Sequence, residues 1–147
     1  SLSDGYLESI RVSNAPYLFQ LEGDWVFNDN ITHTLREIIE AMENEGIYHL
    51  RFNKRANKIA GWDKRMDEMS CGGIAYCVTN NMSNNPHIIN REKYNKEIAA
   101  YIRRSPGSKG IEEMLLRAPF DGAIYGPMNY PATVCHIDGR QGKRLKI

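Results

Sequence analysis

The feature that most constrains the fold is a run of apolar residues with helical spacing in the first third of the chain. Such a pattern predicts an amphipathic α-helix that must bury one face against another element. A helix here needs a polar cap at its start, for which Asn30 or Thr32 is suitable, and Gly46 is placed to end it. The apolar face consists of Ile31, Leu35, Ile38, Ile39 and Met42, at positions i, i+4, i+7, i+8 and i+11.

The remaining patterns alternate between short strands and helices. Gly23-Asp24 separates the first two strands and predicts a hairpin turn. Residues 53–70 are charged, so we expect a loop with at most one helical turn, followed later by an Asn-rich loop around Pro86. The predicted strands span residues 17–22, 25–27, 47–52, 73–79, 122–125 and 133–137, and further helices span 91–104 and 108–117.

This order of elements predicts the α+β class. We expect a largely antiparallel sheet with about three helices packed on one face. The length of 147 residues and the hydrophobic content of 41% fit a single domain over residues 1–147. Because the chain starts with Ser1 and not Met, we expect a processed or tag-cleaved product, or a piece excised from a larger protein. The apolar runs are far shorter than the roughly 20 residues of a membrane span, so no membrane partner is predicted.

Three cysteines, Cys71, Cys77 and Cys135, make an odd number that does not suggest a disulfide framework. The simplest interpretation is a cytoplasmic or other reducing intracellular compartment. Cys77 lies in an apolar strand and is expected to be a buried, inert thiol. The cysteine spacings do not match a structural zinc site, so no metal is predicted.

Charge is divided sharply along the chain. Residues 1–50 contain nine acids and two bases, whereas residues 51–147 contain seventeen bases and nine acids. The two parts carry about −7 and +8, which the net charge of +1 conceals. This asymmetry predicts either a basic surface for a polyanion or two complementary faces that attract each other.

The positive charge is densest in residues 51–65, called the basic loop here, and in the C-terminal tail. The loop contains one acid, Asp63, and two aromatic residues, Phe52 and Trp62. Interleaved cations and aromatic rings favour single-stranded nucleic acid, because cations neutralise phosphates and rings stack on bases. If all six loop cations met phosphates, the salt slope would be about −4. The alternative is a solvated loop that Trp62 anchors to the core. The predicted nucleic-acid-binding residues are Arg51, Lys54, Arg55, Lys58, Trp62, Lys64 and Arg65, with Lys143 and Arg144 in the tail.

A non-enzymatic binding module without a cofactor is therefore the leading interpretation. The acidic first third supports an alternative, a protein-interaction or self-association module that docks against a basic partner or a second copy.

A second alternative is enzymatic. Asp121 before a strand, followed by Asp138-Gly139-Arg140 after the next one, resembles the metal-binding core of PD-(D/E)xK nucleases. The resemblance implies Mg²⁺ held by Asp121 and Asp138, with Arg140 where that family has lysine. Arginine cannot act as a general base, so only an electrostatic role would remain for it. Alternatively, Asp121-Gly122 and Asp138-Gly139 are ordinary turns.

Overall fold

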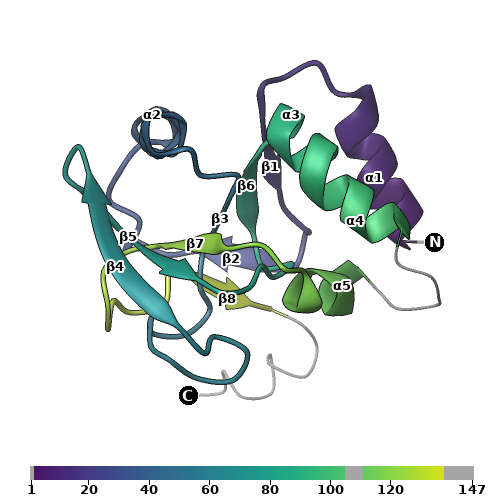
Figure 1. Ribbon diagram of the computed structural model, residues 1–147. Coiled ribbons are helices and arrows are strands. Elements are labelled where there is room, and N and C mark those ends of the chain that lie inside the picture. Colours follow the sequence, from purple (N-terminus) through teal and green to yellow (C-terminus); the bar gives the residue numbers. More distant parts are fainter. Residues whose placement is uncertain (1, 105–110, 138–147) are drawn as a thin grey trace.

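A six-stranded sheet forms the centre of the protein (Figure 1). The computed structural model describes residues 2–104 and 111–137. The strand order of the six-stranded sheet is β1-β6-β3-β7-β5-β4, and every neighbouring pair is antiparallel except β3 and β7. The predicted α+β class is confirmed. The strands are β1 (Tyr17–Gln20), β3 (His49–Arg51), β4 (Met66–Cys71), β5 (Ile74–Thr79), β6 (His87–Asn90) and β7 (Gly122–Tyr125).

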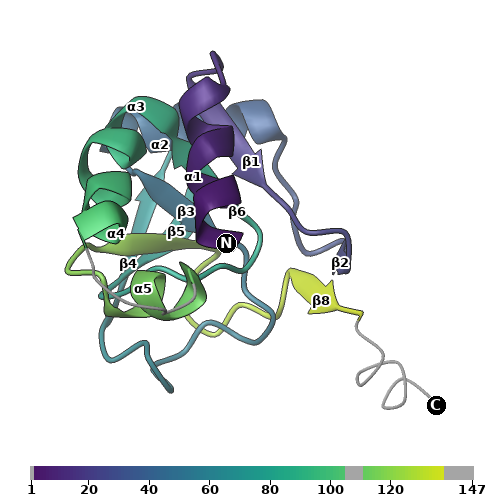
Figure 2. The same ribbon diagram turned by 90° about the vertical axis from the view of Figure 1, so that its right-hand side faces the viewer.

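A second sheet has two strands, β2 (Trp25–Phe27) and β8 (Val134–His136), which pair antiparallel. Figure 2 shows it to one side of the main sheet. Strands were predicted in both places, but the predicted hairpin around Gly23-Asp24 is wrong. β1 pairs with β6 while β2 pairs with β8, so the turn joins two different sheets.

The predicted first helix is α2 (Leu35–Glu45). Neither Asn30 nor Thr32 caps it: the cap is Thr34, whose side chain accepts a hydrogen bond from the Glu37 amide at 3.2 Å. Gly46 ends the helix with φ of 67°, as predicted, because glycine adopts this left-handed conformation without steric cost. The second predicted helix is also confirmed, as a continuous run of α3 (Arg91–Lys93), a π-helical turn (Tyr94–Ile98) and α4 (Ala99–Arg104).

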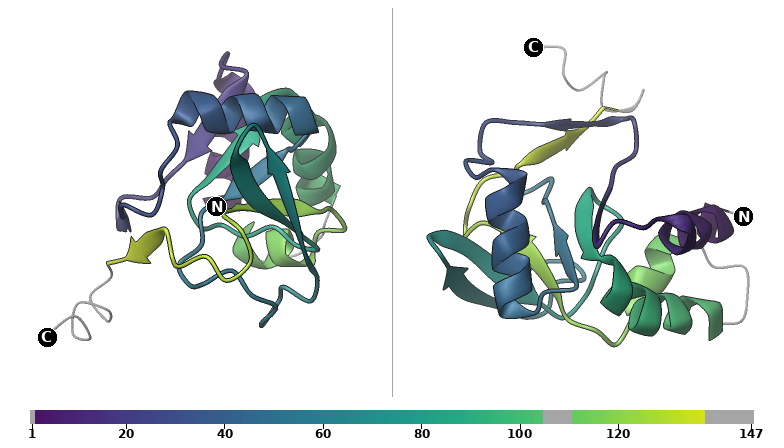
Figure 3. Two further views of the ribbon diagram at one scale, coloured as in Figure 1. Left: turned by 90° about the vertical axis from the view of Figure 1, so that its left-hand side faces the viewer. Right: turned by 90° about the horizontal axis from the view of Figure 1, so that it is seen from above.

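Helices lie on both faces of the main sheet, not on one face as predicted (Figure 3). Strand β6 shows why, because its two buried isoleucines belong to different cores. Ile88 packs with α2, whereas Ile89 packs with α1 (Leu2–Val12), the 91–104 helix and α5 (Ile111–Arg117). No helix was predicted over residues 2–12. Its buried residues Tyr6, Leu7 and Ile10 complete the second core.

Two strands were not predicted. β4 is an edge strand with only Met66 buried, so its sequence lacks an apolar pattern. Gly72 and Gly73, both with positive φ, join it to β5 in a two-residue hairpin turn. β6 follows the Asn-rich loop and contributes only two apolar residues.

A buried aromatic cluster joins α1 to the sheet. His87 Nδ1 lies 2.7 Å from the Asn85 carbonyl and must donate to it, so neutral Nε2 accepts from the Tyr6 hydroxyl at 3.0 Å. Tyr94 in turn donates to Tyr6 at 2.6 Å. His49 stacks on His87 with ring centroids 4.2 Å apart. Burial lowers the pKa of His87 to about 4 and holds that of His49 well below its usual value.

Within residues 2–104 and 111–137, no helix is both long enough and apolar enough to cross a membrane.

Candidate nucleic-acid interface

The basic loop connects β3 to β4 and contains a tight turn that displays Trp62. Ala60 and Asp63 exchange both backbone hydrogen bonds, at 3.1 and 3.0 Å. Gly61 is the first central residue of this turn, with φ of 59°, which other residues rarely adopt. Trp62 follows it and is 51% exposed, and nearby Ile59 is 58% exposed. The turn therefore places a large aromatic ring at the surface among the cations.

A buried ion pair between Arg51 and Asp63 anchors this turn, because Asp63 is its last residue. Arg51 ends β3 and is only 3% exposed. Its Nη2 lies 2.8 Å and 2.7 Å from the two Asp63 oxygens. Arg55 Nη2 also donates to Asp63 at 3.3 Å and to the Ala60 carbonyl at 3.1 Å. The Asp63 carboxylate thus ties the end of a central strand to the exposed turn.

Asp63 is ionised in this setting. Burial alone raises the pKa of its carboxyl, but the Arg51 charge and hydrogen bonds from Arg51, Thr79 and Asn81 outweigh burial and hold that pKa below its ordinary value. Thr79 Oγ1 and Asn81 Nδ2 each donate to Oδ1 at 2.7 Å. Burial lowers the pKa of Arg51, an effect that Asp63 opposes. The Arg51 Nε is buried and has no hydrogen-bond partner among the described residues.

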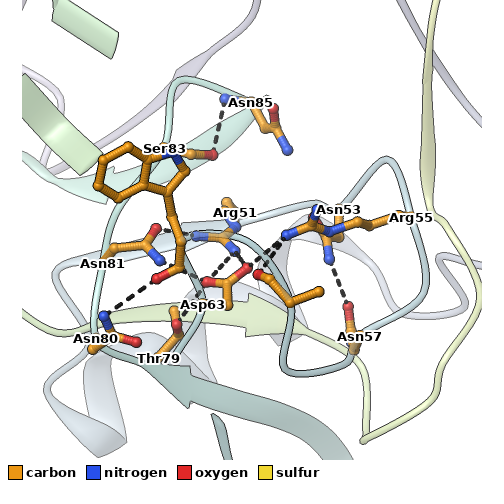
Figure 4. Close-up of polar contacts among 12 residues, drawn as sticks. Arg51, Asn53, Arg55, Asn57, Asp63, Thr79, Asn80, Asn81, Ser83 and Asn85 are labelled. Carbon is orange, nitrogen blue, oxygen red and sulfur yellow. Dashed lines mark hydrogen bonds and ion pairs between the residues drawn. The ribbon is translucent and has the colours of Figure 1, made fainter. Parts of the chain in front are cut away.

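The Asn-rich segment after β5 forms the wall against which the loop packs (Figure 4). Asn80 Oδ1 accepts from the Lys64 and Arg65 amides at 2.9 and 3.0 Å, and its Nδ2 donates to the Trp62 carbonyl at 3.3 Å. Asn81 accepts from Arg51 Nη1 at 3.0 Å. The C-terminal side of the Trp62 turn is therefore fixed to the segment that follows β5.

Asn57 fixes the first half of the loop to the end of β7 and the residues just after it. Its buried Nδ2 lies 3.0, 3.3 and 3.1 Å from the carbonyls of Tyr125, which ends β7, and of Gly126 and Pro127, which follow it. Its own amide donates to the Tyr130 carbonyl at 3.0 Å. The loop is thus held at both ends by amide side chains within the fold.

A cavity of about 210 Å³ opens between the loop and the Asn-rich wall. Cationic, amide, hydroxyl and aromatic groups all contribute to its surface. Its lining residues are Arg51, Asn53, Lys54, Arg55, Trp62, Asp63, Asn81, Ser83, Asn85 and Leu116.

The predicted cations of the loop differ in how far they are neutralised. Arg51 is buried against Asp63, and Arg65 pairs with Asp67 at 3.0 Å and Asp121 at 2.7 Å. Lys54, Lys58 and Lys64 are exposed, and no described residue forms an ion pair with them. Arg55 is half-exposed and shares Asp63. The charge available to a ligand therefore comes from the three lysines and Arg55.

The acidic first third of the chain does not neutralise this surface among the described residues. The arginines of the basic loop pair with Asp63, Asp67 and Asp121, which all belong to the second part. Contacts between the two parts lie elsewhere, as in His136 Nε2 to Asp24 at 2.5 Å. Among the described residues, therefore, no acid of residues 1–50 forms an ion pair with a cation of the basic loop.

The residues of the nuclease interpretation are only partly described. Asp121 is exposed just before β7, and its carboxylate accepts from Arg65. Asp138 and Arg140 lie outside the described residues, as do Lys143 and Arg144 of the predicted tail surface. Among residues 2–104 and 111–137, no group of three His, Cys, Asp or Glu side chains is arranged to hold a metal.

The cysteines are free thiols. Cys77 is fully buried and donates to the Gly126 carbonyl, as its predicted core role requires. Burial raises the pKa of its thiol to about 11, so it is protonated and unreactive at neutral pH.

The polar side chains of the Asn-rich segment that line the site were not predicted as site residues. Asn80, Asn81, Ser83 and Asn85 fall in a segment whose composition indicated only a turn-prone loop. The concentration of asparagines was visible, but its placement beside residues 51–65 depends on the β3-β7-β5 strand order.

Comparison with known proteins gives no family for the chain: neither a family model nor a curated protein matches its sequence.

Proposed function

We propose that this chain is a non-enzymatic module that binds single-stranded nucleic acid through the basic loop, with Lys143 and Arg144 of the tail adding charge. The observation that carries the proposal is the exposed Trp62 ring, held on a rigid turn among cations that no acid of the first third neutralises in the described residues. The proposal rests on chemistry at this surface alone.

The available cations suit a phosphate backbone. Lysines and arginines that meet phosphates release condensed counterions, which makes binding weaken with salt. Four cations remain accessible, namely Lys54, Arg55, Lys58 and Lys64. At about 0.7 per phosphate on a single strand, they give a salt slope of about −3, smaller than the −4 expected from sequence.

The aromatic ring favours single strands over duplexes. Bases in a single strand offer a free face to an aromatic side chain, and each such stack contributes about 1–3 kcal/mol. The Arg117 guanidinium, which pairs with Glu113 at 3.1 Å, lies over one face of the Trp62 ring at 6.0 Å from its centroid, so a base would stack on the other face.

The buried network beneath the loop supports the proposal energetically. Binding is weakened when flexible groups must be ordered, and a preorganised surface avoids that cost. Here Asp63, Asn80 and Asn57 fix the loop before any ligand arrives.

The test is fluorescence anisotropy with labelled single-stranded and double-stranded oligonucleotides of matched length, from low to physiological salt. We expect tighter binding of the single strand and a slope of log K against log salt between about −3, from the four loop cations alone, and about −4, with Lys143 and Arg144 added. Replacing Lys54, Lys58 and Lys64 together with alanine should reduce that slope by about 2 and weaken binding to all sequences alike.

The matched control replaces three exposed cations of the 91–104 helix, Lys96, Arg103 and Arg104, with alanine. This variant has the same net charge as the loop variant but leaves the loop intact. Equal losses in the two variants, or no binding by the unchanged protein at low salt, would contradict the proposal.

A further inference from the structure

The cavity beside Trp62 contains polar groups that the fold leaves uncommitted. Lys54 has no ion-pair partner among the described residues. The Asn85 side-chain amide makes no hydrogen bond there either, because its structural contacts use the backbone amide and carbonyl. Ser83 Oγ accepts from the Asn85 amide, which leaves its hydroxyl hydrogen free to donate. These three side chains line the same space.

The charge of the cavity selects for anions. Three cations, Arg51, Lys54 and Arg55, line it against one acid, Asp63. The buried Arg51 charge is paired with Asp63, so the excess positive charge of the lining comes from Lys54, which no described acid pairs with, and from Arg55, which shares Asp63 with Arg51. A cavity with this excess attracts a negatively charged ligand.

The size of the cavity limits that ligand to a small unit. At about 210 Å³ it is smaller than the roughly 300–1,000 Å³ of pockets for drug-sized molecules. It combines an aromatic ring, hydrogen-bonding side chains and cations. These three groups match the three parts of a nucleotide: the ring suits the flat face of the base, the hydrogen-bonding side chains suit its polar edge, and the cations suit the phosphate.

We propose that the cavity holds one nucleotide of the bound strand. Its base lies against Trp62 with its edge toward Ser83 and Asn85, and its phosphate lies at Lys54 and Arg55. The proposal rests on the function proposed above and makes it specific: the rest of the loop binds backbone, while this cavity receives a single unstacked base. Asn85, unlike a surface lysine, then contributes to recognition of the base.

The test uses the full chain with Trp25 replaced by phenylalanine, so that Trp62 is the only tryptophan. Circular dichroism confirms the fold of this variant. Nucleoside monophosphates are titrated to roughly 10 mM while Trp62 emission is followed, with inorganic phosphate as the probe without a base and free tryptophan as the optical blank. We expect saturable quenching by the monophosphates and none by inorganic phosphate.

Two lysines of the same loop provide a matched pair of variants. Lys54 lines the cavity and Lys58 does not, although both are exposed and carry the same charge. Lys54→Ala should weaken monophosphate binding about tenfold, whereas Lys58→Ala should change it less than twofold. Asn85→Ala, which leaves the Asn85 backbone contacts in place, should also weaken it about tenfold without changing the oligonucleotide salt slope.

The possible failures are distinguishable. If the protein binds oligonucleotides but monophosphates do not quench Trp62, or if Lys54→Ala and Lys58→Ala act equally, the nucleotide cavity is refuted and the proposed function survives. If oligonucleotides do not bind either, both proposals are refuted.

Discussion

The Arg51–Asp63 pair shows how one contact organises the candidate site at the scale of single residues. Both side chains are about 3% exposed, so each charge depends on the other for compensation. Attraction between buried charges offsets a large desolvation cost, and removing one partner leaves the other charge buried without compensation.

Asp63→Asn should therefore destabilise the protein by about 3–5 kcal/mol in urea unfolding. The matched control is Asp67→Asn, because Asp67 also pairs with an arginine but is 59% exposed. That exposed pair contributes about 0–1 kcal/mol. Similar losses in the two variants would show that Asp63 is not the central partner described above.

The alternation in residues 48–51 did not indicate that both faces of β3 (His49–Arg51) are buried, and Tyr48, just before the strand, packs against a different core from Leu50. Tyr48 and Leu50 alternate with His49 and Arg51, and a sheet covered on one face would leave the second pair in solvent. Helices cover both faces, so His49 and Arg51 are buried. Arg51 was thus predicted within the right loop, but it is buried against Asp63 and Asn81, which only the tertiary structure brings to it.

At the scale of elements, glycines mark where the backbone has no room for a side chain. Gly122 opens β7, and a Cβ added to it would lie 2.6 Å from the Asn81 carbonyl oxygen and 3.1 Å from Met82 Cγ. Because Asn81 also belongs to the wall of the cavity, β7 and the site are packed against the same backbone.

Gly122→Ala should cost about 1–3 kcal/mol in urea unfolding, since backbone must move to admit the methyl group. Gly23→Ala is the control: beyond its chain neighbours, no atom of the described residues would lie within 4 Å of an added Cβ, and its φ is not positive. There the change should be within about 1 kcal/mol of zero. A neutral Gly122→Ala would indicate a looser approach of Asn81 to β7 than described.

Local chemistry predicted some element boundaries and missed others. The end of α2 at Gly46 could be predicted because glycine is the residue that most readily adopts the left-handed conformation required there. β4 could not be predicted, because an edge strand needs few buried apolar residues and only Met66 of this one is buried. The Asn-rich wall was missed for a similar reason: asparagines indicate turns equally well whether or not a charged loop packs on them.

At the scale of the whole molecule, the buried histidines make stability depend on pH. His87 faces Tyr6 of α1 and His49 of β3, and the Arg51 charge further disfavours its protonation. In the folded state the pKa of His87 is about 4, against 6.5 when unfolded. Between these values the unfolded chain binds a proton that the folded protein does not.

Stability should therefore be fully present above about pH 6.5 and fall as the pH decreases toward 4, by roughly 3 kcal/mol from His87 and further from His49. Urea unfolding across this range measures the loss. In a His87→Gln variant the decrease should be smaller than in the unchanged protein, even if that variant starts from a lower stability. An equally steep decrease would assign the pH dependence to other groups.

The parallel pair β3–β7 has a consequence for the order in which the chain folds. β7 lies between β3 and β5, yet Ala123 of β7 follows its partner Leu50 by about 70 residues. Until residues 122–125 leave the ribosome, the strands form two fragments, β1-β6-β3 and β5-β4, each with an unpaired inner edge. Such edges recruit other chains, and distant pairings form slowly. Nascent chains halted before Gly122 should thus be the most prone to aggregate, and β7 closes the sheet late in synthesis.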